Sequence, residues 1–163
     1  MIIMKRLILV RHAKSSWEHN VSDHERPLST RGFKDANNVS NQLIDQLHPD
    51  LVLSSDALRA KTTAEIFVSN LNISLEIFNL DHNLYDFSGN NLLRVIKSTT
   101  NAINELLVFG HNNAITSLAN SYGNRYIENV PTCGVVVMEF ETESWTEVKT
   151  GRTTKTFFPR DLK

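Results

Sequence analysis

The chain has 163 residues, of which 40% are hydrophobic and 21% charged, and its formal net charge at pH 7 is -1. This length fits a single domain, residues 1–163, and the balanced charge excludes a global preference for nucleic acid or membrane surfaces, so any anion site must be local. The single cysteine, Cys133, excludes an intramolecular disulfide and a multi-cysteine zinc site, and we expect a cytoplasmic protein.

Strand and helix signals alternate along most of the chain. The apolar run Leu7–Val10 predicts a buried strand, and this run is too short for a signal-peptide core or a membrane span. The next predicted elements, in chain order, are a helix with Ala36, Val39, Leu43 and Leu47 on one face that ends at Pro49, a strand at Asp50–Ser54, a helix from about Ala57 to Val68, a strand at Leu75–Phe78, a helix from about Asn90 to Lys97, a strand at Leu106–Phe109, and a helix at Asn113–Ser121 that Gly123 terminates.

The last part of the sequence has a different pattern. Val135–Phe140 and Trp145–Lys149 are predicted strands, and the hairpin-length connection Glu141–Ser144 predicts that they pair antiparallel. Together with the preceding alternation, this predicts an α/β fold: a three-layer α/β/α sandwich whose central sheet is mostly parallel, with an antiparallel edge and helices on both faces.

Three predicted strands end in side chains that suit a phosphate. Arg11 and His12 follow the first strand, Arg59 lies in the first helical turn after the second, and His111 follows Gly110 at the end of a later strand. If these strands are neighbours, their carboxyl ends bring two guanidiniums and two imidazoles to one pocket, which complements a dianionic phosphoryl group. Nearby cations lower a histidine pKa and leave a neutral nitrogen that can attack phosphorus. The sequence therefore predicts a phosphate site with a nucleophilic histidine.

Four motifs occur in order along the chain: LVRHAKSSW at Leu9–Trp17, RPLSTRG at Arg26–Gly32, SSDALRAKTTA at Ser54–Ala64, and GHN at Gly110–Asn112. This set resembles the histidine phosphatase superfamily, which has a phosphoglycerate mutase-like fold, and in particular its short SixA-like phosphohistidine phosphatases. The resemblance covers most of the chain. It implies that His12 attacks phosphorus and forms a phosphohistidine intermediate, that Arg11, Arg59 and His111 bind the equatorial oxygens, and that water then releases phosphate.

Further substrate-binding candidates lie near these motifs. The resemblance implies that Ser15 contacts phosphate, and Asn112 lies near a helix start, where backbone donors favour anions. Arg26 is a third candidate, with an ion pair inside its own loop as the alternative. We expect no metal and no cofactor, because cationic side chains take the role that magnesium has in many phosphoryl transferases, and the histidine spacing shows no metal motif.

The general acid is the point where the chain departs from the wider family. Many relatives place a glutamate after the third strand, whereas this chain reads HNLYD at His82–Asp86. Asp86 is the nearby acid in that run, and Asp23 and Glu25 are alternatives, because the loop before Arg26 that carries them could fold over the pocket. Because imidazole is a better leaving group than an alkoxide, the missing glutamate favours a phosphohistidine substrate.

The substrate class stays open between several readings. No connection is long enough for a cap domain, and an open pocket would admit phosphohistidine on a protein surface, a small phosphorylated substrate, or phosphate- and sulfate-like anions. The alternatives are a small-molecule phosphomonoesterase, a phosphoglycerate mutase-like enzyme, and a non-catalytic phosphate-binding module. His24 and His82 are expected on the surface, with His24 at the pocket rim as the alternative.

Overall fold

A single six-stranded sheet organises residues 4–162, the part of the chain that the computed structural model describes. Its strands are β1 (Lys5–Arg11), β2 (Leu51–Ser54), β3 (Phe78–Leu80), β4 (Glu105–Gly110), β5 (Val135–Phe140) and β6 (Arg152–Phe157). They lie in the order β3-β2-β4-β1-β5-β6. The pairs β3–β2, β2–β4 and β4–β1 are parallel, whereas β5 is antiparallel to both β1 and β6. The mostly parallel sheet with an antiparallel edge is confirmed.

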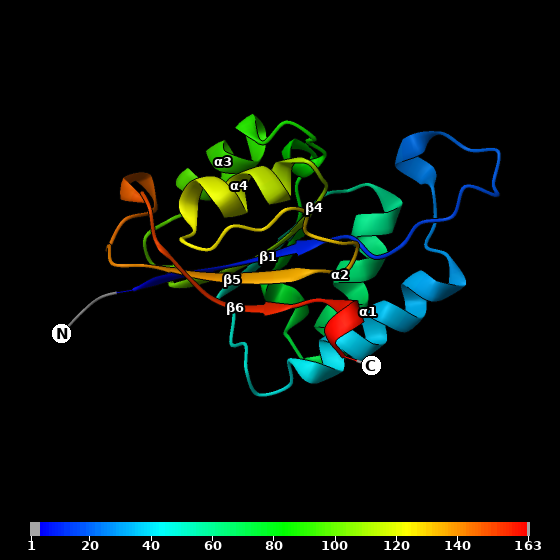
Figure 1. Cartoon of the computed structure of the whole chain (residues 1–163), viewed down its shortest axis with the longest axis horizontal. Coiled ribbons are helices and arrows are strands. Elements are labelled where there is room, and N and C mark those ends of the chain that lie inside the picture. The colour runs from blue at the N-terminus through cyan, green and yellow to red at the C-terminus, as the bar shows by residue number, and fades with distance from the viewer. Residues whose placement is uncertain (1–3, 163) are drawn as a thin grey trace.

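Helices cover both faces of the sheet, as the alternating pattern predicts. They are α1 (Thr30–Gln42), α2 (Leu58–Asn70), α3 (Asn90–Lys97) and α4 (Ala114–Tyr122). Helices α1 and α2 pack on one face, and α3 and α4 pack on the other (Figure 1). The three-layer sandwich is therefore confirmed.

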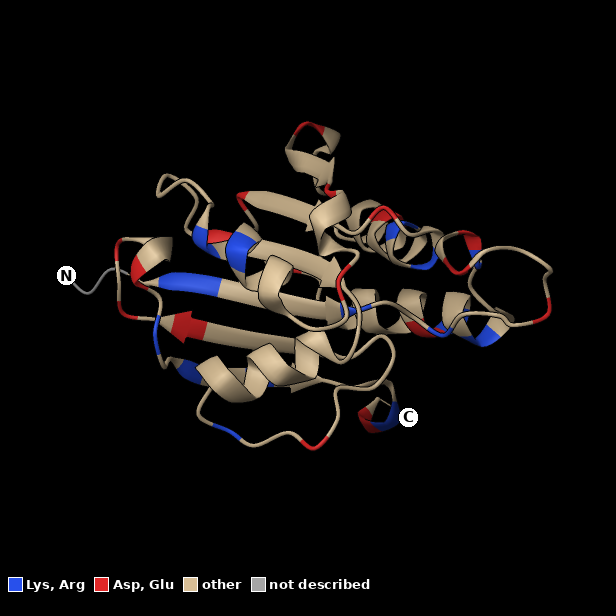
Figure 2. Cartoon of the chain, turned by 90° about the horizontal axis from the view of Figure 1, so that it is seen from above, with Lys and Arg blue, Asp and Glu red and all other residues tan. Residues whose placement is uncertain are grey.

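The two layers of core follow from the alternation of side chains along a strand. In β1, Ile8 and Val10 join the cluster that contains buried residues of α1 and α2. Their neighbours Leu7 and Leu9 join the cluster that contains residues of α3 and α4. Charged residues gather in loops, on helices and near strand ends, and the middles of the central strands β2, β4 and β1 carry none, whereas Lys155 lies inside the edge strand β6 (Figure 2). The central strands therefore offer charged side chains only near their ends.

Two predicted elements in the first half have different bounds. The first helix ends at Gln42 because the chain leaves it through a turn in which Asp45 takes a left-handed φ of 67°, although Leu43 and Leu47 remain buried. The predicted strand Leu75–Phe78 is wrong for its first three residues, which form a 3-10 turn, η2 (Leu75–Ile77), that the Ser74 side chain caps. Only from Phe78 does the chain pair with β2.

The predicted strand Trp145–Lys149 is wrong. This segment begins with a 3-10 turn, η4 (Trp145–Glu147), because the indole of Trp145 is buried and its Nε1 donates a hydrogen bond to the carbonyl of Ile103 at 2.8 Å. The strand that pairs with β5 is instead β6, after Gly151. Its sequence RTTKTF is mostly polar because it lies at the sheet edge, which hides it from a search for apolar runs.

Three further 3-10 turns complete the described structure: η1 (Asp23–Glu25), η3 (His82–Leu84) and η5 (Pro159–Asp161). Within residues 4–162, no helix is long and apolar enough to cross a membrane. The single domain that we expect over residues 1–163 includes residues 1–3 and 163, which lie outside the described range.

The start of α1 holds the loop that follows β1. Ser29 donates hydrogen bonds to the carbonyl of Lys14 from both its backbone N–H, at 2.9 Å, and its hydroxyl, at 3.1 Å. Gly32, in the first turn of α1, packs directly on the same carbonyl, so a Cβ added at this position would overlap the Lys14 oxygen. Glycine is therefore required for a close approach that positions the residues after His12.

We predict that Gly32→Ala lowers the free energy of unfolding by about 1–3 kcal/mol, because the added methyl must push the Lys14 backbone away from α1. Urea denaturation measures the change. Asn38→Ala, at an exposed position of the same helix, is the control and should stay within about 0.5 kcal/mol of the wild type. Equal stability of Gly32→Ala and the control would contradict this packing.

Candidate active site

The carboxyl ends of β1, β4 and β2 bring the predicted residues together. The register pairs Arg11 with Gly110, so the next residues, His12 and His111, also lie opposite each other. The His12 N–H donates to the Gly110 carbonyl at 3.0 Å, and the two imidazole centroids are 5.2 Å apart. Arg59 lies at the start of α2, directly after β2. The sequence prediction thus placed these four side chains at neighbouring strand ends, as the structure does.

His12 is held with its Nε2 free of a proton. Its Nδ1 lies 2.7 Å from the carbonyl oxygen of Ala13, and because a carbonyl only accepts, Nδ1 must carry the hydrogen and Nε2 the lone pair. Burial lowers the pKa of His12 to about 3; the hydrogen bond to Ala13 opposes the shift, and the charges of Arg59 and Arg11 add to it. The imidazole is therefore neutral near pH 7, as a nucleophile requires.

His111 is held as a neutral hydrogen-bond donor. Its Nε2 lies 2.8 Å from the Ser55 hydroxyl, which also accepts the Ala57 N–H at 3.1 Å. The hydroxyl can complete its bonding by donating to Nε2, which leaves the hydrogen of His111 on Nδ1. Burial, followed by the neighbouring charges of His12 and Arg59, lowers the pKa of His111 to about 3. The Nδ1–H is buried and has no partner.

Arg11 and Arg59 each have a hydrogen-bond donor without a partner. Arg11 donates from Nη1 to the Val130 carbonyl at 2.9 Å, and Arg59, whose residue is only 2% exposed, donates from Nη1 to the Asp23 carbonyl at 2.6 Å. In both guanidiniums Nε is buried without a partner. Buried unpaired donors are rare in folded proteins because each costs free energy. The described residues contain four such atoms: Nε of Arg6 lies at the opposite end of β1, 3.7 Å from Glu139, and the other three, on Arg11, Arg59 and His111, lie together and indicate a site for an anion.

The carboxylate of Asp23, in η1, pairs with two arginines at this cluster. Its Oδ2 lies 2.9 Å from Arg59 Nη2 and accepts the Tyr85 hydroxyl at 2.5 Å, while its Oδ1 lies 3.1 Å from Arg26 Nε. Burial raises the pKa of Asp23, but the hydrogen bonds from Tyr85, Arg59 and Arg26 outweigh it and bring the pKa far below its usual range. Asp23 is therefore ionised and neutralises part of the cationic cluster.

Arg26 and Ser15 form one unit beside Asp23. Arg26 is buried and donates from Nη1 to the Ser15 hydroxyl at 2.6 Å. Its guanidinium carbon lies 3.5 Å from the centre of the exposed Trp17 ring. Asp23 bonds to both Arg26 and Arg59 and so connects this pair to Arg59. Arg26 and Ser15, two of the predicted substrate-binding residues, therefore lie beside the unpaired donors of Arg11, Arg59 and His111.

Asp86, a predicted candidate for the general acid, has a different environment. It is 8% exposed, and its carboxylate accepts the backbone N–H groups at the start of α3, which are those of Ser88, Gly89, Asn91 and Leu92. Burial raises the pKa of Asp86, but the hydrogen bonds, that from Leu92 first, lower it overall. Such a carboxylate caps a helix and is a poor proton donor.

The other predicted candidates are also accounted for. The Asn112 side chain donates to Asn129 Oδ1 at 2.8 Å and accepts from the backbone and hydroxyl of Thr116, so its amide holds α4 and the loop before β5. Glu25 is exposed in η1. Neither side chain contributes to the cluster of unpaired donors.

Sequence reasoning missed Tyr85 and Ser55. The ring of Tyr85 lies 5.4 Å from that of His111, and its hydroxyl holds Asp23, so it connects η1 to the cluster. The run His82–Asp86 drew interest only as a source of an acid, and an aromatic residue in a loop gives no further signal. Ser55 stands in the motif at Ser54–Ala64, and only the fold shows that it orients His111.

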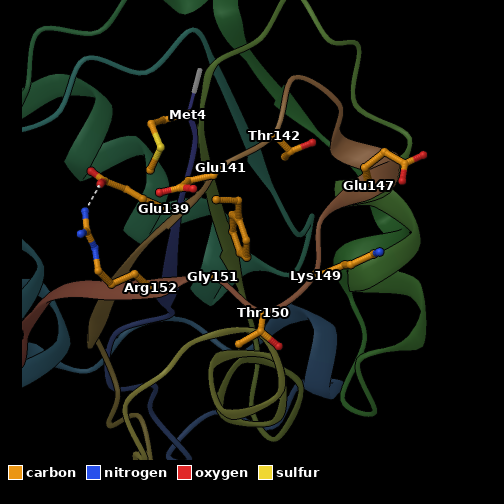
Figure 3. A pocket seen from close by; sticks show the side chains of 10 residues that line it. Met4, Glu139, Glu141, Thr142, Glu147, Lys149, Thr150, Gly151 and Arg152 are labelled. Atoms are coloured by element: carbon orange, nitrogen blue, oxygen red, sulfur yellow. Dashed lines mark hydrogen bonds and ion pairs between the residues drawn. The ribbon is translucent and has the colours of Figure 1, made fainter. Parts of the chain in front are cut away.

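One concave region lies at the opposite end of the sheet from His12 and His111. It is a hollow of about 470 Å³ between Met4, β5, β6 and the loop around Lys149 (Figure 3). Its acidic residues, Glu139, Glu141 and Glu147, outnumber its cations, and Arg152 already pairs with Glu139 at 3.1 Å. This charge does not suit a phosphate, whereas the unpaired donors of Arg11, Arg59 and His111 mark the His12 end as the candidate active site.

Comparisons with known proteins agree with this geometry. Residues 7–84 match the family described as the histidine phosphatase superfamily (branch 1). An uncharacterized chloroplastic protein of Arabidopsis thaliana is 31% identical over 156 residues, which cover 89% of this chain and 71% of that protein. The family match contains Arg11, His12 and Arg59, and ends before His111.

Two solved structures illustrate the shared fold. The protein histidine phosphatase SixA complexed with tungstate is similar at a TM-score of 0.82 and 22% identity, covering 97% of this chain and 99% of that one. A phosphoglycerate mutase of Bacillus anthracis gives a TM-score of 0.61 at 15% identity, with coverage of 90% and 96%. These likenesses confirm the phosphoglycerate mutase-like fold.

We predict that the free energy of unfolding falls as the pH drops below 6.5, the ordinary pKa of a histidine. The unfolded chain then binds protons at His12 and His111, whereas the folded chain takes them up only near pH 3, so stability declines through this window. Each histidine contributes a slope of up to about 1.4 kcal/mol per pH unit.

Urea denaturation at several pH values tests the prediction in His12→Gln, which cannot titrate and should give a shallower slope than the wild type. His48→Gln, at an exposed position, is the control and should keep the wild-type slope. Parallel curves for His12→Gln and the wild type would show that His12 is not held neutral.

Proposed function

Because this chain belongs to the histidine phosphatase superfamily, we propose that it is a phosphatase in which His12 forms a phosphohistidine intermediate. The observation that carries the proposal is a neutral imidazole with a bare Nε2 next to three buried donors that lack partners. Such donors stabilise charge on an incoming phosphoryl group without reorganising, which is the main electrostatic requirement of phosphoryl transfer. A structural histidine would not require this surrounding set.

The proposed reaction has two steps. Nε2 of His12 attacks phosphorus in line, so a P–N bond forms while the bond to the leaving group breaks and its electron pair departs with that group. Arg11, Arg59 and the Nδ1–H of His111 hold the three equatorial oxygens. Water then attacks the phosphorus of the intermediate, breaks the P–N bond, and releases inorganic phosphate and neutral His12. The cationic side chains supply the charge, and we propose that no metal takes part in these steps.

Substrate binding requires Asp23 to leave Arg59. Its carboxylate occupies Arg59 Nη2 at 2.9 Å, and a phosphoryl oxygen at the same donor would place two anions side by side. Asp23 is on η1, and its side chain is 44% exposed, so it can turn outward without disturbing the core. Once it is beside the phosphoryl group and away from Arg59, its pKa rises, and it becomes the candidate that can give a proton to the leaving group.

Phosphohistidine in a protein is the substrate that we propose. Neither Asp86, a helix cap, nor Asp23, an ionised partner of arginines, is a protonated acid in this structure. An imidazole leaving group needs less acid assistance than an alcohol, which favours a phosphoramidate over an ester. The name of the tungstate-bound structure, a protein histidine phosphatase, supports the same class. A small phosphomonoester and a phosphoglycerate mutase-like reaction are the alternatives.

The proposed setting is the cytoplasm. Cys133 is free and buried, and burial raises the pKa of its thiol, which makes it unreactive. A phosphorylated protein domain is the partner that we propose, with small phosphorylated molecules as the alternative.

We predict that His12→Ala lowers phosphate release from a histidine-phosphorylated protein by about 1000-fold or more, because the covalent route is lost. The assay compares phosphohistidine with phosphoserine, phosphotyrosine and phosphoglycerate substrates in metal-free buffer, and His48→Ala is the control. Faster turnover of a small ester would move the protein to metabolite phosphatases. No turnover of any substrate, with phosphate still bound, would indicate a binding module.

We predict that Asp23→Asn lowers the Ki of inorganic phosphate about fivefold, since the anion no longer displaces a carboxylate from Arg59 and Arg26. The same variant should lose more kcat on phosphoserine than on phosphohistidine, because only the alcohol needs a proton from Asp23. Competitive inhibition and kcat for both substrates measure these effects. An unchanged Ki would show that phosphate and Asp23 do not compete.

A further inference from the structure

A second cluster of chemically active side chains lies at the rim of the candidate active site. His24 of η1, Asp56 at the junction of β2 and α2, and His82 of η3 come from three separate segments. His24 Nε2 lies 2.9 Å from Asp56 Oδ1, and His82 Nδ1 lies 3.0 Å from both carboxylate oxygens. One ligand atom from each residue lies within 4.8 Å of the others. The proposed reaction uses none of these side chains.

The geometry of this rim cluster suits a metal ion. In a tetrahedral zinc site with bonds of about 2.0–2.2 Å, neighbouring ligand atoms are about 3.3–3.6 Å apart. Two separations here are 2.9 and 3.0 Å, so small side-chain shifts bring the nitrogen and oxygen atoms to coordinating distance. Imidazole with carboxylate is a ligand set that zinc and its neighbours in the periodic table accept.

Solvent access also fits such a site. The side chains of His24 and Asp56 are 37% and 31% exposed, and that of His82 is 73% exposed. An ion can therefore enter without opening the fold, and water can fill the remaining coordination position. For the ion to bind, each neutral histidine moves its hydrogen, through water, from the nitrogen that faces Asp56 to its other ring nitrogen, and the freed lone pair coordinates the ion.

We propose that His24, Asp56 and His82 bind one divalent transition-metal ion of the zinc class. The ion joins η1 to η3 and to the start of α2. Because it takes no part in phosphoryl transfer at His12, its effect comes through the position of η1.

Bound metal stabilises the closed arrangement of η1. Asp23 precedes His24 and holds Arg59 through both its backbone carbonyl and its carboxylate. The Tyr85 ring lies 5.0 Å from that of His24 and 5.8 Å from that of His82, and its hydroxyl donates to Asp23. An ion that fixes His24 therefore retains Asp23 on Arg59 and opposes anion binding; by linkage, a bound anion weakens metal binding by the same factor. This inhibitory effect rests on the proposed function, whereas the metal site does not.

The binding test uses the full chain freed of metal, with ZnCl₂ titrated by calorimetry and CoCl₂ followed by its visible absorption, which is intense only for tetrahedral cobalt. We expect one ion per chain in the wild type and binding weaker by more than about tenfold in His82→Ala and in Asp56→Asn.

Two controls locate the ion. His48→Ala removes an exposed imidazole near Glu105, at the far end of the sheet. His12→Ala removes one imidazole of the His12–His111 pair, whose ring centroids are 5.2 Å apart. Both should keep wild-type affinity. The proposal is overturned by an absence of saturable binding, by equal affinity of His82→Ala and the wild type, or by loss of binding in His12→Ala.

The inhibitory effect is measured as the ratio of phosphatase rates with and without ZnCl₂ for each protein. Zinc should slow the wild type and His48→Ala several-fold more than His82→Ala. Equal slowing of His82→Ala would overturn the link between the rim cluster and Asp23. If no protein shows phosphatase activity, the proposed function fails, and the calorimetric and cobalt results still decide whether the metal site exists.

Discussion

The parallel pairing of β1 with β4 places two imidazoles side by side, because a register that sets Arg11 against Gly110 must also bring His12 next to His111. The hydrogen bond from the His12 N–H to the Gly110 carbonyl extends this register past the last strand residue. Beside them, the pairing of β2 with β4 delivers Ser55 and, in the next helix, Arg59. A shift of one residue in either ladder would turn these side chains to opposite faces of the sheet.

Burial then sets the chemistry of the cluster. The same exclusion of water that keeps both imidazoles neutral leaves Nε of Arg11 and Arg59 without partners, which costs free energy. Asp23 compensates for part of this cost by pairing with Arg59 and Arg26. The ligand-free protein is thus stabilised by a carboxylate that carries the same sign of charge as the proposed substrate, and this carboxylate belongs to a short turn on the surface.

The sheet and the cluster of Arg11, His12, Arg59 and His111 were predictable because they depend on local signals: apolar runs that end in charged or histidine side chains. Elements set by contacts between distant segments were not. Trp145 forms a turn because its indole reaches Ile103, and β6 is polar because it lies at an edge. The rim cluster of His24, Asp56 and His82 has no spacing that a sequence search would recognise, since η1, β2 and η3 meet only in the folded chain. Asp86 stands near the position where relatives have their general acid, but its carboxylate caps the start of α3.

The stacking of Arg26 on Trp17 has an optical consequence. The chain has two tryptophans, of which Trp145 is fully buried against the core, whereas Trp17 is 76% exposed with a guanidinium 3.5 Å from its ring centre. Emission from Trp145 therefore forms a steady background, and emission from Trp17 depends on whether Arg26 stays in place. Because Arg26 is bonded to both Asp23 and Ser15, any ligand that rearranges that group also changes the surroundings of the indole. We therefore expect the fluorescence of Trp17 to change when a ligand displaces Asp23 from Arg26.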